Sequence, residues 1–78
     1  MTDVVRLDSA RRRAGIPKKV LAAQIGASMR KFEKKMTNRA EFTAREIAVI
    51  TKVLKLRPKE RDDIFFGLCV DYYSTYGR

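Results

Sequence analysis

The sequence predicts an all-α fold of five short helices followed by a short tail. Apolar residues recur three and four positions apart through the first 70 residues, which is the spacing of one helix face. No clear alternating run, the mark of a strand, occurs in that part of the sequence. Glycine and proline separate the helical segments at positions where helices commonly end or begin: Gly15, Pro17, Gly26 and Pro58.

The length of the chain fits one domain. Its 78 residues, 45% of them apolar, suffice for one small core and are too few for two. We therefore expect a single domain over residues 1–78, with the core at about residues 4–68 and a tail at residues 69–78. The tail is β-prone and aromatic, so an arm, a short strand and a frayed end are all compatible with it.

The first two helices are bounded by residues that suit helix ends. The first is expected over Val4–Ala14, with Asp3 as its N-terminal cap and Gly15 in the left-handed conformation that ends many helices. The second is expected over residues 17–25, with Pro17 in the first turn, where a missing N–H costs nothing.

The third helix is short and basic. Ser28 is a good N-terminal cap for a helix over Met29–Met36, and Phe32 and Met36 lie one turn apart on its inner face. With only these two apolar side chains, the helix contributes little to the core. We therefore expect its role to be contact with a partner rather than stabilisation of the fold. Its remaining charged positions are four bases and one acid: Arg30, Lys31, Glu33, Lys34 and Lys35.

The last two helices also carry start signals. A loop at residues 38–41 precedes the capping box Thr43–Glu46, and the fourth helix is expected to reach about Leu56. Pro58 begins the fifth helix, in its first turn. The predicted core residues are apolar and lie on the inner faces of the second to fifth helices: Leu21, Ile25, Phe32, Ile47, Ile50, Leu54 and Phe65.

The net charge of +9 is concentrated in the first half of the chain. Residues 1–20 carry six bases and two acids, and residues 21–39 carry five bases and one acid. Residues 40–78 are almost neutral, with seven bases and six acids. This asymmetry indicates a polyanionic partner, either nucleic acid or anionic lipid. The third helix lacks a broad apolar face and no apolar run approaches about 18 residues, so no membrane partner is expected.

Several chemistries are excluded by composition. The chain has no His and one Cys, which removes His/Cys zinc sites, Ser-His-Asp triads and Cys-His dyads. We expect no catalytic residue, metal, cofactor or small-molecule ligand, and therefore no enzyme. Cys69 cannot form an internal disulfide and the N-terminus is no signal peptide, so a cytoplasmic, nucleoid-associated protein is expected.

The second and third helices form a recognisable pair. A helix of about eight residues, a three-residue turn at Gly26–Ser28 and a short basic helix make up the helix-turn-helix arrangement. Gly26 permits a positive φ in the turn, and Ala22 is small enough for a close helix crossing. The exposed side of the third helix is then free to enter a major groove.

These residues carry a resemblance to a known family. Leu21–Ser28, followed by Phe32, resembles the helix-turn-helix of the Cro/phage-repressor (Xre-like) proteins, and the likeness extends from about Arg6 to Phe66. The later run that begins at Phe42-Thr43-Ala44-Arg45-Glu46-Ile47 is similar to a phage-type subgroup from Gram-positive bacteria.

The resemblance implies roles for particular side chains. Arg30 is the best candidate to bind guanine through O6 and N7, and Met29 offers only apolar contact, for instance to a thymine methyl. The positions that the family uses for base contact are Ser28, Met29, Arg30 and Lys34. The positions expected to hold phosphates are Lys18, Lys19, Lys31, Lys35 and Arg39.

Three departures from the family pattern are visible. Pro17 replaces a polar capping residue, and Lys35 stands where many members have an apolar side chain. Many members also place an acid near Met36 that pairs with an arginine corresponding to Arg11, and this chain lacks that acid.

The resemblance implies a sequence-specific, double-stranded DNA-binding transcriptional regulator, a phage or prophage Cro-like protein or repressor. It would act by operator occupancy as a homodimer on two half-sites. An activator, an excisionase-like architectural factor or an antitoxin would use the same fold, and a protein-interaction module is a further alternative. Candidate dimer-interface residues are Phe66, Tyr72 and Tyr73, although the tyrosines could equally close the core beneath the tail.

Overall fold

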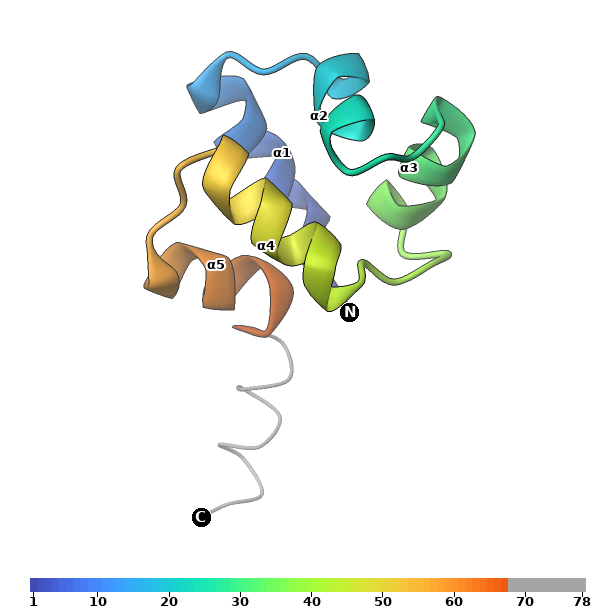
Figure 1. Cartoon of the computed structure of the whole chain (residues 1–78). Helices are drawn as coiled ribbons and strands as arrows, with labels where there is room; N and C mark the ends of the chain where they lie inside the picture. Colours follow the sequence, from blue (N-terminus) through green and yellow to red (C-terminus); the bar gives the residue numbers. More distant parts are fainter. Residues whose placement is uncertain (68–78) are drawn as a thin grey trace.

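The computed structural model describes residues 1–67, and within that range it is all-helical, with no strand. The all-α prediction is therefore confirmed for this part of the chain, while Leu68 and the predicted tail at residues 69–78 lie outside the described residues. The five helices are α1 (Val4–Ala14), α2 (Lys18–Gln24), α3 (Met29–Met36), α4 (Ala44–Val53) and α5 (Pro58–Phe65) (Figure 1).

Three predicted helix ends need correction. The second helix begins at Lys18, because Pro17 has an extended backbone with ψ 150° and occupies the N-cap position, and it ends at Gln24, with Ile25 as its C-cap. The fourth helix ends at Val53 and not near Leu56, because Lys55 adopts a positive φ of 54° that breaks the helical path. The expected starts and ends of α1 and α3 agree with the structure.

Helix α4 lies at the centre of the arrangement and contacts α2 on one side and α5 on the other. Helix α3 packs on α2, and α1 packs on α5 (Figure 1). As a result α3 lies at one edge of the fold, and the connection between α4 and α5 lies at the opposite edge (Figure 1).

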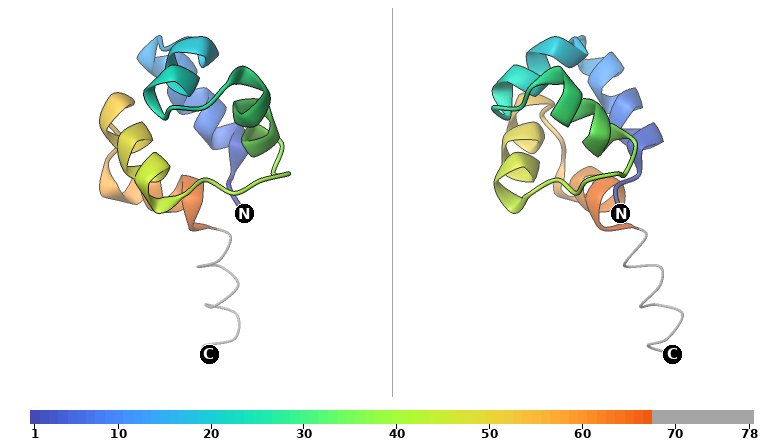
Figure 2. Two further views of the ribbon diagram at one scale, coloured as in Figure 1. Left: turned by 45° about the vertical axis from the view of Figure 1, so that its right-hand side comes forward. Right: turned by 90° about the vertical axis from the view of Figure 1, so that its right-hand side faces the viewer.

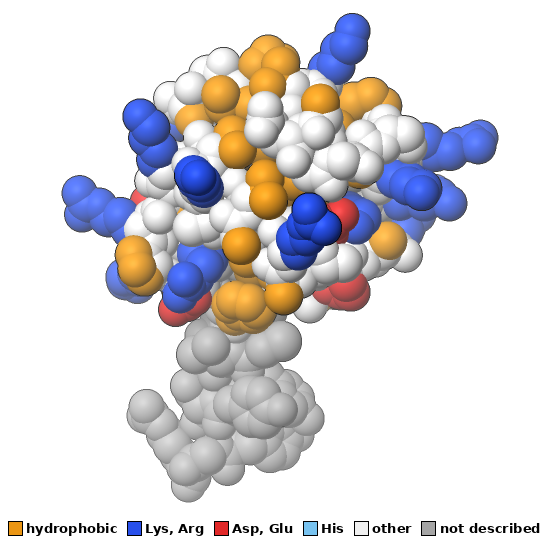
Figure 3. Space-filling model, in the orientation of Figure 1, with side chains coloured by type: hydrophobic (Ala, Val, Ile, Leu, Met, Phe, Trp, Pro, Cys, Tyr) orange, Lys and Arg blue, Asp and Glu red, His pale blue; other side chains and the backbone are white. Residues whose placement is uncertain are grey.

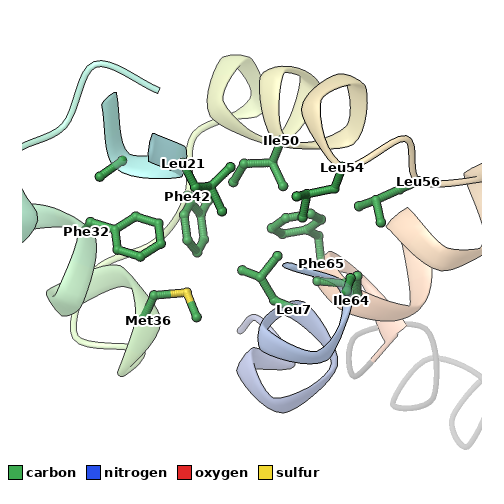
Figure 4. Close-up of a cluster of buried hydrophobic side chains, with 12 residues drawn as sticks. Leu7, Leu21, Phe32, Met36, Phe42, Ile50, Leu54, Leu56, Ile64 and Phe65 are labelled. Carbon is green, nitrogen blue, oxygen red and sulfur yellow. The ribbon is translucent and has the colours of Figure 1, made fainter. Parts of the chain in front are cut away.

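The core is a single cluster of apolar side chains drawn from all five helices and from the segments before and after α4. Leu7, Leu21, Phe32 and Ile50 are fully buried. Phe42, in the loop, extends the cluster between α3 and α5 (Figure 4). Two of the predicted core residues, Ile25 and Ile47, are only partly buried against the cluster. The whole cluster is Leu7, Ala10, Leu21, Ala22, Phe32, Met36, Phe42, Ile50, Leu54, Leu56, Ile64 and Phe65.

Phe42 has a larger role than the sequence indicated. Its position before the capping box predicts a staple residue that covers the start of α4. The structure buries it, and its ring meets Phe65 edge-to-face, with ring centroids 5.7 Å apart and an interplanar angle of 78°. Phe42 therefore joins the loop before α4 to the far side of the core.

The residues that precede α1 tie distant parts of the fold together. The Asn38 side-chain amide accepts a hydrogen bond from the Thr2 N–H at 3.1 Å and donates one to the Thr2 carbonyl at 3.0 Å. The next N–H, from Asp3, donates to the Ile64 carbonyl at 2.7 Å. Figure 2 shows the chain start between the loop that follows α3 and the end of α5. The N-terminal residues thus link the end of α3 to α5.

A conservative change at Ile50 tests the central position of α4. Ile50→Val removes one methylene from a fully buried side chain, so we expect a loss of about 0.5–1.5 kcal/mol in the free energy of unfolding. The control, Val5→Ala, changes a side chain that is 75% exposed and should shift stability by less than about 0.5 kcal/mol. Urea titration followed by circular dichroism measures both, and equal losses would contradict the assigned core.

Candidate nucleic-acid interface

The turn between α2 and α3 has a defined geometry. Gly26 has a φ of +72°, a conformation that glycine adopts without a steric penalty. The Ala27 N–H donates to the Ala22 carbonyl at 2.9 Å, which closes the end of α2. The Ser28 hydroxyl accepts a hydrogen bond from the Lys31 N–H at 3.3 Å and so caps α3. It retains its own proton for donation to another acceptor.

Helix α3 has one buried face and one exposed face. Phe32 and Met36 enter the core beside α2, and the predicted inner face is therefore confirmed. Because these side chains take the inner positions, most of the other side chains of α3 face outward. The four side chains predicted to contact bases are all exposed: Ser28, Met29, Arg30 and Lys34. Lys31, one of the predicted phosphate ligands, is exposed with them.

Three further predicted phosphate ligands flank this surface. Lys19, in the first turn of α2, and Arg39, in the loop after α3, are exposed. Lys18 is partly exposed, and its Nζ lies 3.7 Å from Glu33 Oε1 on α3. A surface pair at this distance contributes little to stability, so Lys18 can exchange the carboxylate for another anion at small cost.

Lys35 does not fit the phosphate role that the resemblance implied. Its side chain is only 13% exposed, and its Nζ contacts Glu46 Oε1 at 2.5 Å. The same ammonium lies 5.8 Å from the centre of the Phe42 ring. The charge of Lys35 is therefore directed toward α4, where it holds α3 in place, and we leave Lys35 out of the candidate interface.

The acid in this pair is also the capping residue of α4. Glu46 Oε1 accepts the Thr43 N–H at 2.9 Å, and the Thr43 hydroxyl accepts the Glu46 N–H, so the predicted capping box is confirmed. Burial raises the pKa of Glu46, but the hydrogen bonds from Lys35 and Thr43 outweigh this effect and hold the pKa below its ordinary value.

Arg11 acquires a partner that the family pattern did not indicate. Its guanidinium donates to Asp8 Oδ1 at 2.9 Å within α1 and to the Ile16 carbonyl at 3.0 Å in the connection to α2. The hydrogen bond from Arg11 is the main reason that the pKa of Asp8 is lowered. With its side chain 13% exposed, Arg11 supports the position of α2 and does not belong to the exposed basic surface.

Arg45 is a residue of this region that sequence reasoning did not single out. It is exposed on the first turn of α4 and lines a shallow groove with Gln24 and Gly26 at the end of α2. The groove separates the α2–α3 turn from the start of α4. The available signal was the position of Arg45 inside the capping box at the start of α4.

The distribution of charge over the molecule has two centres. Figure 3 shows Lys and Arg side chains gathered at the edge where α3 lies and again at the opposite edge. The first group is made up of the exposed bases on and beside α3, described above. The second group surrounds the connection between α4 and α5.

Other kinds of site find little support in the described part of the chain. Within residues 1–67, no group of three or more His, Cys, Asp or Glu side chains is arranged to hold a metal ion. None of the helices described in this range has the length and apolar character needed to cross a membrane. Two predicted dimer-interface residues, Tyr72 and Tyr73, lie outside the described residues, and Phe66 is 42% exposed at the end of α5.

In comparisons with known proteins, the chain matched no family model, no curated protein and no solved structure. The functional interpretation therefore depends on the geometry of the α2–turn–α3 unit, the side chains that it exposes and the motif resemblance.

The ion pair between Lys35 and Glu46 predicts a specific pH dependence. Glu46→Gln keeps the capping geometry, since an amide oxygen accepts the same bonds, but removes the charge that faces Lys35. At pH 7 we expect a loss of about 1 kcal/mol in the free energy of unfolding. Because the folded pKa of Glu46 is lowered, this contribution is complete above the ordinary value of 4.5 and disappears as the pH falls through the folded pKa.

Urea titrations between pH 7 and pH 2 measure this difference between the wild type and the variant. The matched control is Glu33→Gln, which makes the same change at an exposed carboxylate. This carboxylate lies 3.7 Å from the Lys18 ammonium. A constant difference over the whole pH range for Glu46→Gln would show that the ion pair does not stabilise the fold.

Proposed function

We propose that the chain is a helix-turn-helix protein that reads double-stranded DNA with α3. The observation that carries this proposal is the division of α3 into two faces. Phe32 and Met36 fix the inner face, and the outer face presents bases beside the capped first turn. The DNA major groove is about 12 Å wide and accepts one helix, so such a face can approach base edges directly.

Each exposed side chain has a chemistry suited to a part of the groove. The Arg30 guanidinium is a planar fork that can donate to O6 and N7 of one guanine. Lys34 lies one turn further along α3 and can donate to a base or to an adjacent phosphate. Met29 offers an apolar surface for a thymine methyl, and the Ser28 hydroxyl retains a proton for a base or phosphate oxygen.

The phosphate backbone would be held by the bases around α3. Lys19 is exposed in the first turn of α2, Arg39 is exposed in the loop after α3, and Lys31 is exposed on α3 itself. Lys18 would join them by releasing Glu33. Contacts of this kind fix the register of the protein on the duplex and supply affinity that decreases steeply with salt.

The role that this reading supports best is transcriptional regulation by occupancy of an operator, as the resemblance to the Cro/phage-repressor proteins suggests. Two copies would bind two half-sites about one helical turn apart. Phe66 is a candidate for the contact between them, because it is exposed beside a groove whose apolar lining includes Ile47 and Ala48. A protein of this kind acts on the nucleoid in the cytoplasm.

Selection of binding sites from a random duplex DNA library tests this function. We expect one enriched sequence with two related half-sites, and an affinity that falls as a power of the salt concentration because phosphate contacts release counterions. Sedimentation of the chain with a selected duplex should give two copies per site. No enrichment, combined with an affinity that does not depend on salt, would contradict DNA reading.

Replacement of Arg30 tests the base contact itself. Arg30→Ala should weaken binding to the selected duplex by about 1–3 kcal/mol and relax the preference at one base pair, while nonspecific binding changes little. Fluorescence anisotropy with the selected duplex and with single-base variants measures both effects.

The control for this experiment is Lys59→Ala, which removes one positive charge from a side chain that is 87% exposed. Lys59 belongs to α5, and Figure 1 shows α5 apart from α3. This variant should leave the base preference intact. If the two variants lose affinity equally and on all sequences, Arg30 acts only through its charge and the base contact is refuted.

A further inference from the structure

Lys55 adopts a backbone conformation that its residue type disfavours. Four residues within positions 1–67 have a positive φ, and two of them are glycines, Gly15 and Gly26. The third, Asn38, belongs to a residue type that tolerates this conformation, and its amide makes both hydrogen bonds to Thr2. The fourth is Lys55, with φ 54°.

The conformation of Lys55 ends α4. The Leu56 N–H donates to the Thr51 carbonyl at 2.9 Å, and the Lys55 N–H donates to the Lys52 carbonyl at 3.3 Å. Glycine is the usual residue at such a helix end because it has no Cβ to clash. Lys55 is exposed, and within the described residues its side chain makes no hydrogen bond or ion pair. The backbone hydrogen bonds at the end of α4 hold this conformation, but the Lys55 side chain itself contributes no hydrogen bond or ion pair to it within residues 1–67.

Lys55 lines a groove of about 900 Å³ beside the connection between α4 and α5. This connection lies at the edge opposite α3 in Figure 1. Apolar groups form part of its lining, contributed by the end of α1 and the end of α4: Ala14, Ile16, Val53 and Leu54. The charged side chains of the lining are four bases and two acids: Arg13, Lys55, Arg57, Lys59, Glu60 and Asp63.

The two acids of the groove are already engaged by two of its bases. Arg13 contacts Glu60 at 2.6 Å, and Lys59 contacts Asp63 at 3.4 Å. Lys55 and Arg57 therefore supply the excess positive charge of the groove. Bases at a helix C-terminus also complement the helix dipole, but that benefit does not require a lysine at the strained position itself.

A second, smaller groove continues this surface along α1 and α5. Its volume is about 300 Å³, and it shares Arg13, Glu60 and Asp63 with the first groove. Val5, which is exposed, adds an apolar group to its lining. The two grooves therefore adjoin at the ion pair between Arg13 and Glu60, and one extended peptide can lie along both of them.

We propose that these two grooves bind a peptide segment of a protein partner that combines acidic and apolar side chains. Acidic side chains match Lys55 and Arg57, and apolar side chains match the lining beside Ile16 and Val53. A DNA backbone matches the surface poorly, because it would leave the apolar lining uncovered. The site is remote from α3, so this binding does not depend on DNA recognition.

Selection from a displayed library of random dodecapeptides, with the full chain as target, tests this site. We expect enrichment of peptides in which Asp or Glu alternates with apolar residues. A fluorescein-labelled copy of one selected peptide then serves as the probe in anisotropy titrations.

The decisive variant is Lys55→Gly, because it should weaken peptide binding without lowering stability. Glycine relieves the strain at φ 54°, so the urea midpoint should rise or stay equal. The same change removes the side-chain charge, so affinity for the peptide should fall by about tenfold.

Lys55→Arg keeps the charge and should bind within about twofold of the wild type. Arg39→Ala, which removes an exposed charge in the loop after α3, should bind like the wild type.

Several results would overturn this assignment. The first is a library without acidic–apolar enrichment, and the second is a selected peptide that binds Lys55→Gly as tightly as the wild type. The third is an equal loss of peptide affinity in Arg39→Ala, which would show that the peptide is attracted by the net positive charge of the molecule and not by the groove. A loss of DNA affinity in Lys55→Gly that matches the loss in Arg30→Ala would assign the groove to DNA instead.

Discussion

The burial of Phe32 is the interaction on which the candidate interface depends. Helix α3 has eight residues, and a helix of this length is not stable alone in water. It also carries four bases, which repel one another. The fully buried Phe32 ring, with Met36 one turn later, holds the helix against the rest of the core. Without this anchor the bases on the outer face would have no fixed direction.

Polar contacts fix α3 along its whole length. The Ser28 hydroxyl caps its start, Lys35 pairs with Glu46 near its end, and Asn38 joins the following loop to Thr2. The contacts of Lys35 and Asn38 satisfy groups that would otherwise be partly buried without a partner. Together they leave only the outward side chains of α3 free to meet a ligand.

The basic side chains of the protein fall into those paired within the fold and those exposed on two surfaces. Several bases are engaged within the fold, as Arg11 is with Asp8 and Arg13 with Glu60. The bases around α3 and those around the connection between α4 and α5 lie at opposite edges (Figure 3). The net charge of +9 indicated a polyanionic partner, and its arrangement in space is consistent with two separate surfaces. A partner at one surface leaves the other accessible.

The sequence by itself determined the features that depend on near neighbours along the chain. Helix starts at Asp3, Ser28 and Thr43 could be read because a cap acts on a residue three positions later. Only the tertiary structure decided which way the charged side chains point. Lys35 and Glu46 are 11 positions apart, Thr2 and Asn38 are 36 apart, and Arg13 and Glu60 are 47 apart. Such pairs form only when separate helices pack, and no local pattern specifies which partners then meet.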